Sequence, residues 1–208
     1  MSIMARSRRS GFTLIELLIV VAIAAVLLAL VAPSFTDMIA MQRLRGAHDQ
    51  LATDVQFARA EAARRGIPVH VRVQPKSPSG PACYILFTDK GASAEFPYAF
   101  TMPACNCAQP PGSRCSAAAT AEVKTVILEA FTGLDLNLAG TPVLDRVGFD
   151  PATGMLFAPA PDSPTPAPGE LVVDTLLDSA RRMRLQVGRT GRVQVCAPTG
   201  STVKAVAC

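Results

Sequence analysis

The sequence predicts an α+β protein, in which a long N-terminal helix packs on a mainly antiparallel β-rich head. Residues 12–65 carry a helical hydrophobic pattern that is almost entirely apolar over 12–32 and amphipathic afterwards. From residue 67 onward, short segments of alternating apolar and polar side chains are separated by turns that contain glycine and proline. The length of 208 residues suits one globular domain with an appendage.

The N-terminal segment has two parts. Residues 1–11 form a basic leader with Arg6, Arg8 and Arg9, and residues 12–32 are apolar except for Thr13 and Glu16. As a helix, this apolar run of 21 residues would span about 30 Å, the thickness of a bilayer core. Arginines before the run and none directly after it predict a single membrane pass, with a cytoplasmic N-terminus and a periplasmic head.

Two simpler explanations account for this segment less well. A secretory signal peptide has a shorter apolar core followed by a small-residue cleavage site, whereas this core is long and continues into a helical pattern. An ordinary membrane anchor leaves Glu16 unexplained, because a carboxylate inside an apolar span is costly and indicates a functional site.

Residues 11–17, with the sequence Gly-Phe-Thr-Leu-Ile-Glu-Leu, resemble the prepilin motif of type IV pilins and type II secretion pseudopilins. The resemblance implies that a prepilin peptidase cleaves between Gly11 and Phe12, and that Phe12 is then N-methylated. It also implies that Glu16 meets the N-terminal amine of a neighbouring pilin, where each charge lowers the other's cost of desolvation. Pro33 matches a proline that loosens this helix in pilins. The expected location is the bacterial inner membrane, with assembly into a pilus or pseudopilus.

Residues 33–66 are predicted to continue the helix along the head. Apolar side chains, together with His48, recur at steps of three and four residues, which places them on one helix face: Met41, Leu44, His48, Leu51, Val55, Ala58 and Ala62. His48 is therefore expected to be a core residue rather than a ligand. Gly66 is a suitable C-cap for the end of the helix.

Residues 67–208 are predicted to form the periplasmic β-rich head. The expected strands are residues 67–73, 83–87, 123–128, 146–149 and 155–157. A turn is expected at Asp150–Gly154, between the last two strands. Two stretches are expected to be irregular: residues 96–119, and an exposed, extended proline-rich loop at 158–169.

The last strands are predicted to form a hairpin. Residues 182–187 and 192–196 alternate in polarity on either side of a turn that contains glycine. A loop with an odd number of residues pairs Leu185 with Val193 or Val195 and keeps the apolar side chains on one face. That register places five polar residues on the other face: Arg182, Arg184, Gln186, Arg192 and Gln194.

The six cysteines all follow the apolar segment, in the part expected to be exported, and their even number favours disulfides. Zinc is a weaker explanation, because the spacing of Cys105, Cys107 and Cys115 is not that of paired C-x-x-C ligands and the two histidines are distant. Cys196 and Cys208 are the favoured pair, since they flank a short segment. The other four, at positions 83, 105, 107 and 115, leave three pairings open. No metal or other cofactor is expected.

The head resembles the GspH/FimT group of minor pilins and pseudopilins. The segments that carry this resemblance are residues 58–66, 147–154 and 191–196, while the middle of the chain contributes little. The group implies a low-abundance, non-enzymatic subunit at or near a filament tip. We therefore expect a minor pilin that helps initiate or cap type IV pilus assembly. A pseudopilin of type II secretion is the alternative, and a major pilin is disfavoured because the head does not resemble theirs.

A third hypothesis is DNA capture during natural transformation. Some related minor pilins bind DNA through C-terminal arginines, and Arg182, Arg184, Arg189 and Arg192 could contact phosphates here. However, the motif of those relatives is G-R-x-R, whereas Gln194 stands in the last position, and the hairpin has no aromatic residue to stack on bases. The net charge of +4 also falls to +1 without the three arginines of the leader. A solvated face or a subunit contact is therefore favoured.

Nothing in the sequence favours an enzyme. The chain has no phosphate-binding loop, no nucleophile near a histidine and no cluster of metal ligands. Asp174 and Asp178 could form a carboxylate pair, but they are interpreted as loop or turn residues.

Overall fold

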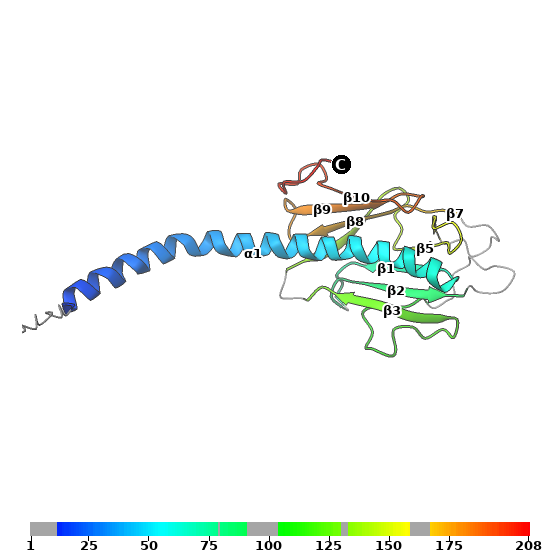
Figure 1. Cartoon of the computed structure of the whole chain (residues 1–208), viewed down its shortest axis with the longest axis horizontal. Helices are drawn as coiled ribbons and strands as arrows, with labels where there is room; N and C mark the ends of the chain where they lie inside the picture. The colour runs from blue at the N-terminus through cyan, green and yellow to red at the C-terminus, as the bar shows by residue number, and fades with distance from the viewer. Residues whose placement is uncertain (1–11, 79, 91–103, 130–132, 159–166) are drawn as a thin grey trace, which may run out of the picture. The chain divides into compact units, whose positions relative to one another are not determined.

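The computed structural model describes residues 12–78, 80–90, 104–129, 133–158 and 167–208, without the side chains of residues 30–34 and 167. The chain divides into two compact units, Met1–Ala40 and Met41–Cys208. Helix α1 (Leu14–Arg65) runs through both of them (Figure 1). The helix predicted for residues 12–65 is therefore confirmed, and so is the α+β class.

The first unit is an apolar helical segment. Its large hydrophobic side chains are exposed around the whole helix: Leu14, Ile15, Leu17, Leu18, Ile19, Val20, Val21, Ile23, Val26, Leu27 and Leu28. Among the described residues, no helix has both the length and the apolarity needed to cross a membrane. Pro33 lies within the span of α1, but its side chain is outside the described part, as is the whole of Gly11.

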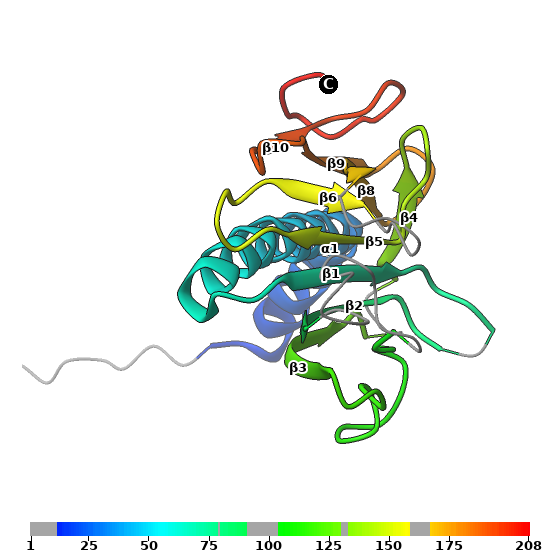
Figure 2. The ribbon, with the colours of Figure 1, turned by 90° about the vertical axis from the view of Figure 1, so that its right-hand side faces the viewer.

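The described strands of the second unit form two antiparallel sheets (Figure 2). The first has the order β3-β2-β1-β5-β6-β7. Its strands are β1 (Val69–Gln74), β2 (Cys83–Asp89), β3 (Thr120–Ile127), β5 (Arg146–Phe149), β6 (Leu156–Ala158) and β7 (Ala167–Pro168). The second has the order β10-β9-β8-β4. Its strands are β4 (Asp135–Ala139), β8 (Leu171–Leu176), β9 (Arg182–Val187) and β10 (Val193–Cys196).

The core of this unit is shared by α1 and both sheets. On the predicted apolar face of the helix, Leu44, Leu51, Val55, Ala58 and Ala62 are fully buried. They belong to one apolar cluster with side chains of β1, β8 and β9: Val69, Val71, Val73, Leu171, Val173, Leu185 and Val187. This burial of one helix face against alternate residues of the strands is the main stabilising interaction of the head.

Two buried polar side chains of the helix, Asp54 and His48, attach it to the sheets. The Asp54 carboxylate accepts a hydrogen bond from the Tyr84 hydroxyl (2.8 Å) and one from Lys124 Nζ (2.6 Å). His48 is fully buried, as expected for a core residue, and its Nδ1 lies 3.0 Å from Thr175 Oγ1. Buried polar groups that are paired in this way fix the position of one element on another, because losing the partner is costly.

The C-terminal hairpin has the predicted odd loop. Val195 is opposite Leu185 and Val193 is opposite Val187, so the apolar side chains share a face. The turn predicted at Asp150–Gly154 is also present, with the Gly154 N–H donating to the Asp150 carbonyl.

Several predictions of loop and strand need correction. Strands β4 and β8 were not predicted, and Asp174 lies in β8 rather than in a loop. Because β8 is central in its sheet and its residues 171–175 are all buried, it lacks the alternation of a half-buried strand. The proline-rich loop is shorter than expected, since Ala158 pairs with Ala167 at the ends of β6 and β7. Residues 159–166 of that loop are outside the described part.

Candidate functional site

The N-terminal segment begins the helix with a defined cap. Thr13 precedes α1, and its Oγ1 accepts a hydrogen bond from the Glu16 N–H (3.3 Å). The spacing Thr-x-x-Glu is that of a capping box, a signal for the start of a helix that can be read from the sequence. A carboxylate in the first turn also interacts favourably with the positive end of the helix dipole. Glu16 therefore has a local structural role in addition to any role in assembly.

Phe12 and Glu16 are both exposed, and Glu16 is the only ionisable residue of the apolar segment 12–32. Placed among apolar neighbours, its carboxylate would need an opposite charge to offset the loss of hydration. An N-terminal ammonium group on a second chain has the charge and small size that such a partner requires.

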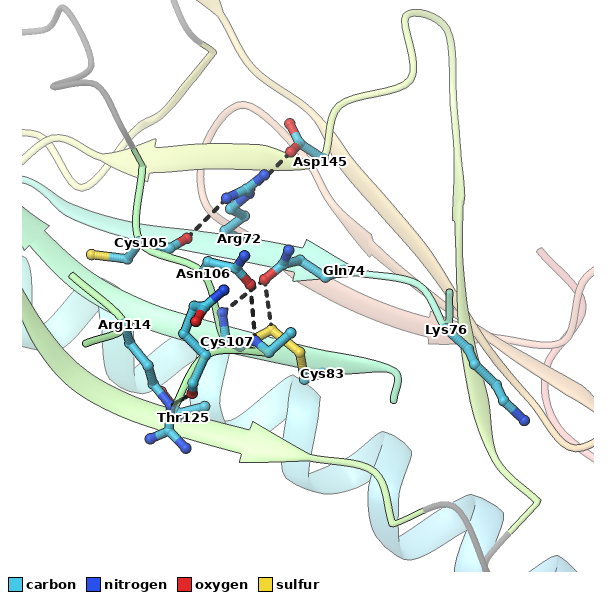
Figure 3. The surroundings of a disulfide bond; sticks show 12 residues. Arg72, Gln74, Lys76, Cys83, Cys105, Asn106, Cys107, Arg114, Thr125 and Asp145 are labelled. Atoms are coloured by element: carbon cyan, nitrogen blue, oxygen red, sulfur yellow. Dashed lines mark hydrogen bonds and ion pairs between the residues drawn. A yellow bond between two sulfur atoms is a disulfide. The ribbon is translucent and has the colours of Figure 1, made fainter. Parts of the chain in front are cut away.

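One disulfide holds the segment after residue 104 on the first sheet, and a second closes a loop within that segment. Cys83 of β2 is bonded to Cys107, as Figure 3 shows. Cys105 is bonded to Cys115, so the two bonds together select one of the three open pairings. Together with Ile85 and Phe87, these cysteines form a second, smaller apolar cluster: Cys83, Cys105 and Cys107, with Cys115 against it. β2 is thus buried on both faces.

Hydrogen bonds from β1 add to this attachment. Gln74 Oε1 accepts from the Cys107 N–H (2.7 Å), and Arg72 Nη1 donates to the Cys105 carbonyl (3.0 Å), as Figure 3 shows. Arg72 also pairs with Asp145 at 3.2 Å. The third disulfide joins Cys196 to Cys208, the pair favoured from the sequence, and closes the C-terminal loop.

The C-terminal arginines do not form one free surface. Arg184 donates two hydrogen bonds, of 2.6 and 2.8 Å, to the carboxylate of Asp174, whose side chain is only 2% exposed. Arg182 Nη2 donates to the Thr199 carbonyl (2.9 Å). Arg189 and Arg192 are exposed, on the turn between β9 and β10. Only the latter two of the four arginines are thus available for a phosphate or for another subunit.

Both histidines are buried in the head. Burial lowers the pKa of His48 and, with the nearby Arg146, lowers that of His70 to about 3. The His70 ring stacks on Phe87 and meets Phe157 edge-on. Among the described residues, no group of three histidine, cysteine or acidic side chains could hold a metal ion.

Comparison with known protein families gives two matches, one in the N-terminal segment and one that covers most of the head. The family model described as "Prokaryotic N-terminal methylation motif" matches residues 6–32, and the model "Type II transport protein GspH" matches residues 47–191. A comparison with curated protein sequences finds no match.

Two solved structures are similar, both of the type IV minor pilin FimU of Pseudomonas aeruginosa (strain PAO1) in different crystal forms. One is 13% identical with a TM-score of 0.44, and covers 77% of this chain and 98% of its own. The other is 14% identical with a TM-score of 0.47, and covers 79% of this chain and 95% of its own.

The prepilin-type motif implies processing by a peptidase, anchoring in the inner membrane and assembly with other pilins. The GspH model covers more than half of the chain, including most of the head. The protein therefore belongs to the GspH family of prepilin-type subunits, which are structural proteins and not enzymes.

Proposed function

We propose that this chain is a minor pilin that helps initiate or cap the assembly of a type IV pilus. The observation that carries the proposal is the combination of a prepilin-type helix, whose apolar side chains are uncovered from Leu14 to Leu28, with a GspH head in the same chain. So much apolar surface requires a lipid or protein environment.

In this proposal, the peptidase removes residues 1–11 and Phe12 becomes the methylated N-terminus. Residues 12–32 lie in the inner membrane, and the head lies in the periplasm. The pairing of all six cysteines in disulfides suits that oxidising compartment. During assembly, the apolar helix exchanges its lipid neighbours for the helices of other pilins.

Glu16 then acts as the charge that positions each new subunit. Its carboxylate pairs with the ammonium group of Phe12 on a neighbouring pilin, and Pro33 loosens the helix beyond the membrane. In an apolar environment the two charges stabilise each other, and removal of either one leaves the other without compensation.

A pseudopilin of a type II secretion system is the second candidate. It is favoured by the description of the matching family model, "Type II transport protein GspH". A type IV pilus is displayed on the cell surface, whereas a pseudopilus serves the secretion of other proteins, so the phenotype of a deletion separates them.

The experiment is to delete the gene and to quantify the major pilin sheared from the cell surface together with the secreted enzymes. We expect a large loss of sheared pilin, restored by the wild-type gene but not by Glu16→Ala. The same change at an exposed position of the head, Glu170→Ala, is the matched control and should restore pili. Normal pili with a loss of secretion would replace the proposal by the pseudopilin, and normal levels of both would refute it.

A further inference from the structure

A groove of about 610 Å³ lies on the head, between α1 and two turns. One wall is the helix, the second is the turn between β5 and β6, and the third is the turn between β9 and β10. We call it the arginine groove. Its defining residues are Gln56, Arg59, Ala60, Ala63, Pro151–Gly154 and Gly191–Val193.

Two glycines shape the floor of the arginine groove. Gly154 has φ +66° and Gly191 has φ +74°, conformations that side chains other than glycine rarely adopt. A Cβ atom added at Gly154 would lie 2.7 Å from Arg59 Nε, and one added at Gly191 would lie 2.7 Å from the Gly154 carbonyl oxygen. The missing side chains thus leave the space that the Arg59 guanidinium occupies.

The arginine groove is positively charged and has no acidic side chain among the residues that line it. Arg59 and Arg192 both line it and both are exposed, and within the described residues neither guanidinium has an ion-pair partner. Most other arginines of the head are paired with acids: Arg64, Arg65, Arg72, Arg114, Arg181 and Arg184. Glu61, which follows Ala60 in the sequence, is buried and paired with Arg64 and Arg65. Asp150, which precedes Pro151, is also buried. Its Oδ1 accepts hydrogen bonds from the backbone N–H groups of Ala152 and Thr153.

We propose that the arginine groove binds an acidic peptide segment of another protein, with the carboxylates of that segment on Arg59 and Arg192. Guanidinium groups bind carboxylates through two parallel hydrogen bonds, and two such contacts would fix the direction of an extended segment. The small, exposed side chains of Ala60 and Ala63 allow a peptide backbone to approach closely. The volume is in the range of sites that enclose a small ligand or a few residues.

Nucleic acid fits the arginine groove less well. Binding to a duplex depends on many phosphate contacts along a track, and this site offers two cations in one short groove. Binding of single strands relies on aromatic side chains that stack on bases, and none lines the site. The proposal depends only on the head, so it holds for a pilus or a secretion pseudopilus and is independent of Glu16.

The experiment uses the full mature chain in non-ionic detergent micelles and a fluorescent hexaglutamate peptide as the probe, with hexaglutamine for comparison. Anisotropy at low ionic strength gives the Kd. We expect binding of hexaglutamate only, and a Kd about tenfold higher for Arg59→Gln/Arg192→Gln, as two partly exposed ion pairs would give. The matched control, Arg45→Gln/Arg189→Gln, removes the same charge from the same two elements outside the groove, and should leave the Kd unchanged.

A second variant tests the space rather than the charge. Ala60 is exposed on the helix surface, so Ala60→Phe fills the groove without disturbing the core, and it should abolish binding at unchanged net charge. Equal weakening by the control pair would show unspecific attraction and overturn the proposal. An unchanged Kd for hexaglutamate in the groove variants would also overturn it. The same holds if the chain binds duplex DNA more tightly than hexaglutamate and the groove variants abolish that binding. This binding measurement does not involve pilus assembly. A negative result would therefore overturn the peptide-binding proposal and leave the proposed function unaffected.

Discussion

Replacing Arg184 by methionine tests how this head uses its C-terminal arginines. Arg184 lies directly opposite Asp174 in the β8–β9 register and holds its carboxylate through two hydrogen bonds. The Asp174 side chain is 2% exposed, so water cannot replace the lost partner. Removing one member of a buried pair leaves a charge without compensation and costs about 3–5 kcal/mol. We therefore expect Arg184→Met to lower the free energy of unfolding by an amount in this range.

The assay is urea unfolding of the full chain in mild detergent, followed by circular dichroism. The double variant Asp174→Leu/Arg184→Met removes both charges, and it should recover most of the loss, because apolar residues of similar size often replace a buried ion pair without cost. Arg192→Met is the control and should change the free energy by less than about 0.5 kcal/mol, as for an exposed side chain. An Arg184→Met variant as stable as this control would refute the structural role and return Arg184 to the candidates for DNA contact.

Three further predictions concern the core and the chain end. Burial lowers the pKa of His70 to about 3, whereas in the unfolded chain it is near 6.5. The unfolded state therefore binds the extra proton, and stability falls as the pH drops from about 6.5 to about 3, by at most about 1.4 kcal/mol per pH unit from this group. His70→Leu should make the free energy of unfolding depend less on pH in this range. An unchanged dependence would contradict the lowered pKa of His70. Tyr84→Phe removes a hydrogen bond to the buried carboxylate of Asp54, and should cost about 1.5–3 kcal/mol by urea unfolding; no measurable loss would argue against this contact. Cys196→Ser/Cys208→Ser opens the C-terminal loop and should lower stability by up to about 3 kcal/mol and expose residues 197–208 to protease. Equal resistance of the two proteins to protease would show that the bridge is dispensable.

Where the hydrophobic pattern repeats with one period, the sequence was sufficient to predict the fold. The helix face from Leu44 to Ala62 is buried as its spacing requires, and the register of Leu185 with Val195 follows from keeping apolar side chains together. Both predictions need only neighbours in the sequence. The N-terminal motif is equally local, because Phe12, Thr13 and Glu16 lie in one turn of chain.

The prediction was wrong where burial depends on distant segments. β8 was missed because a central strand covered on both faces loses the alternation that identifies a strand. The acidic residue within it looked like part of a turn, since its partner Arg184 lies ten residues further on. The arginine groove was also out of reach, because it joins Arg59 of the helix to a turn near the C-terminus. No local sequence pattern indicates that Arg59 and this turn lie close together.

The direct test of the central claim is the intact mass of this chain recovered from filaments sheared from wild-type cells. If the chain is a processed filament subunit, we expect it in the sheared fraction with the mass of residues 12–208, one added methyl group and three disulfides. A chain that is absent from that fraction, or that keeps residues 1–11, would contradict its role as a processed filament subunit.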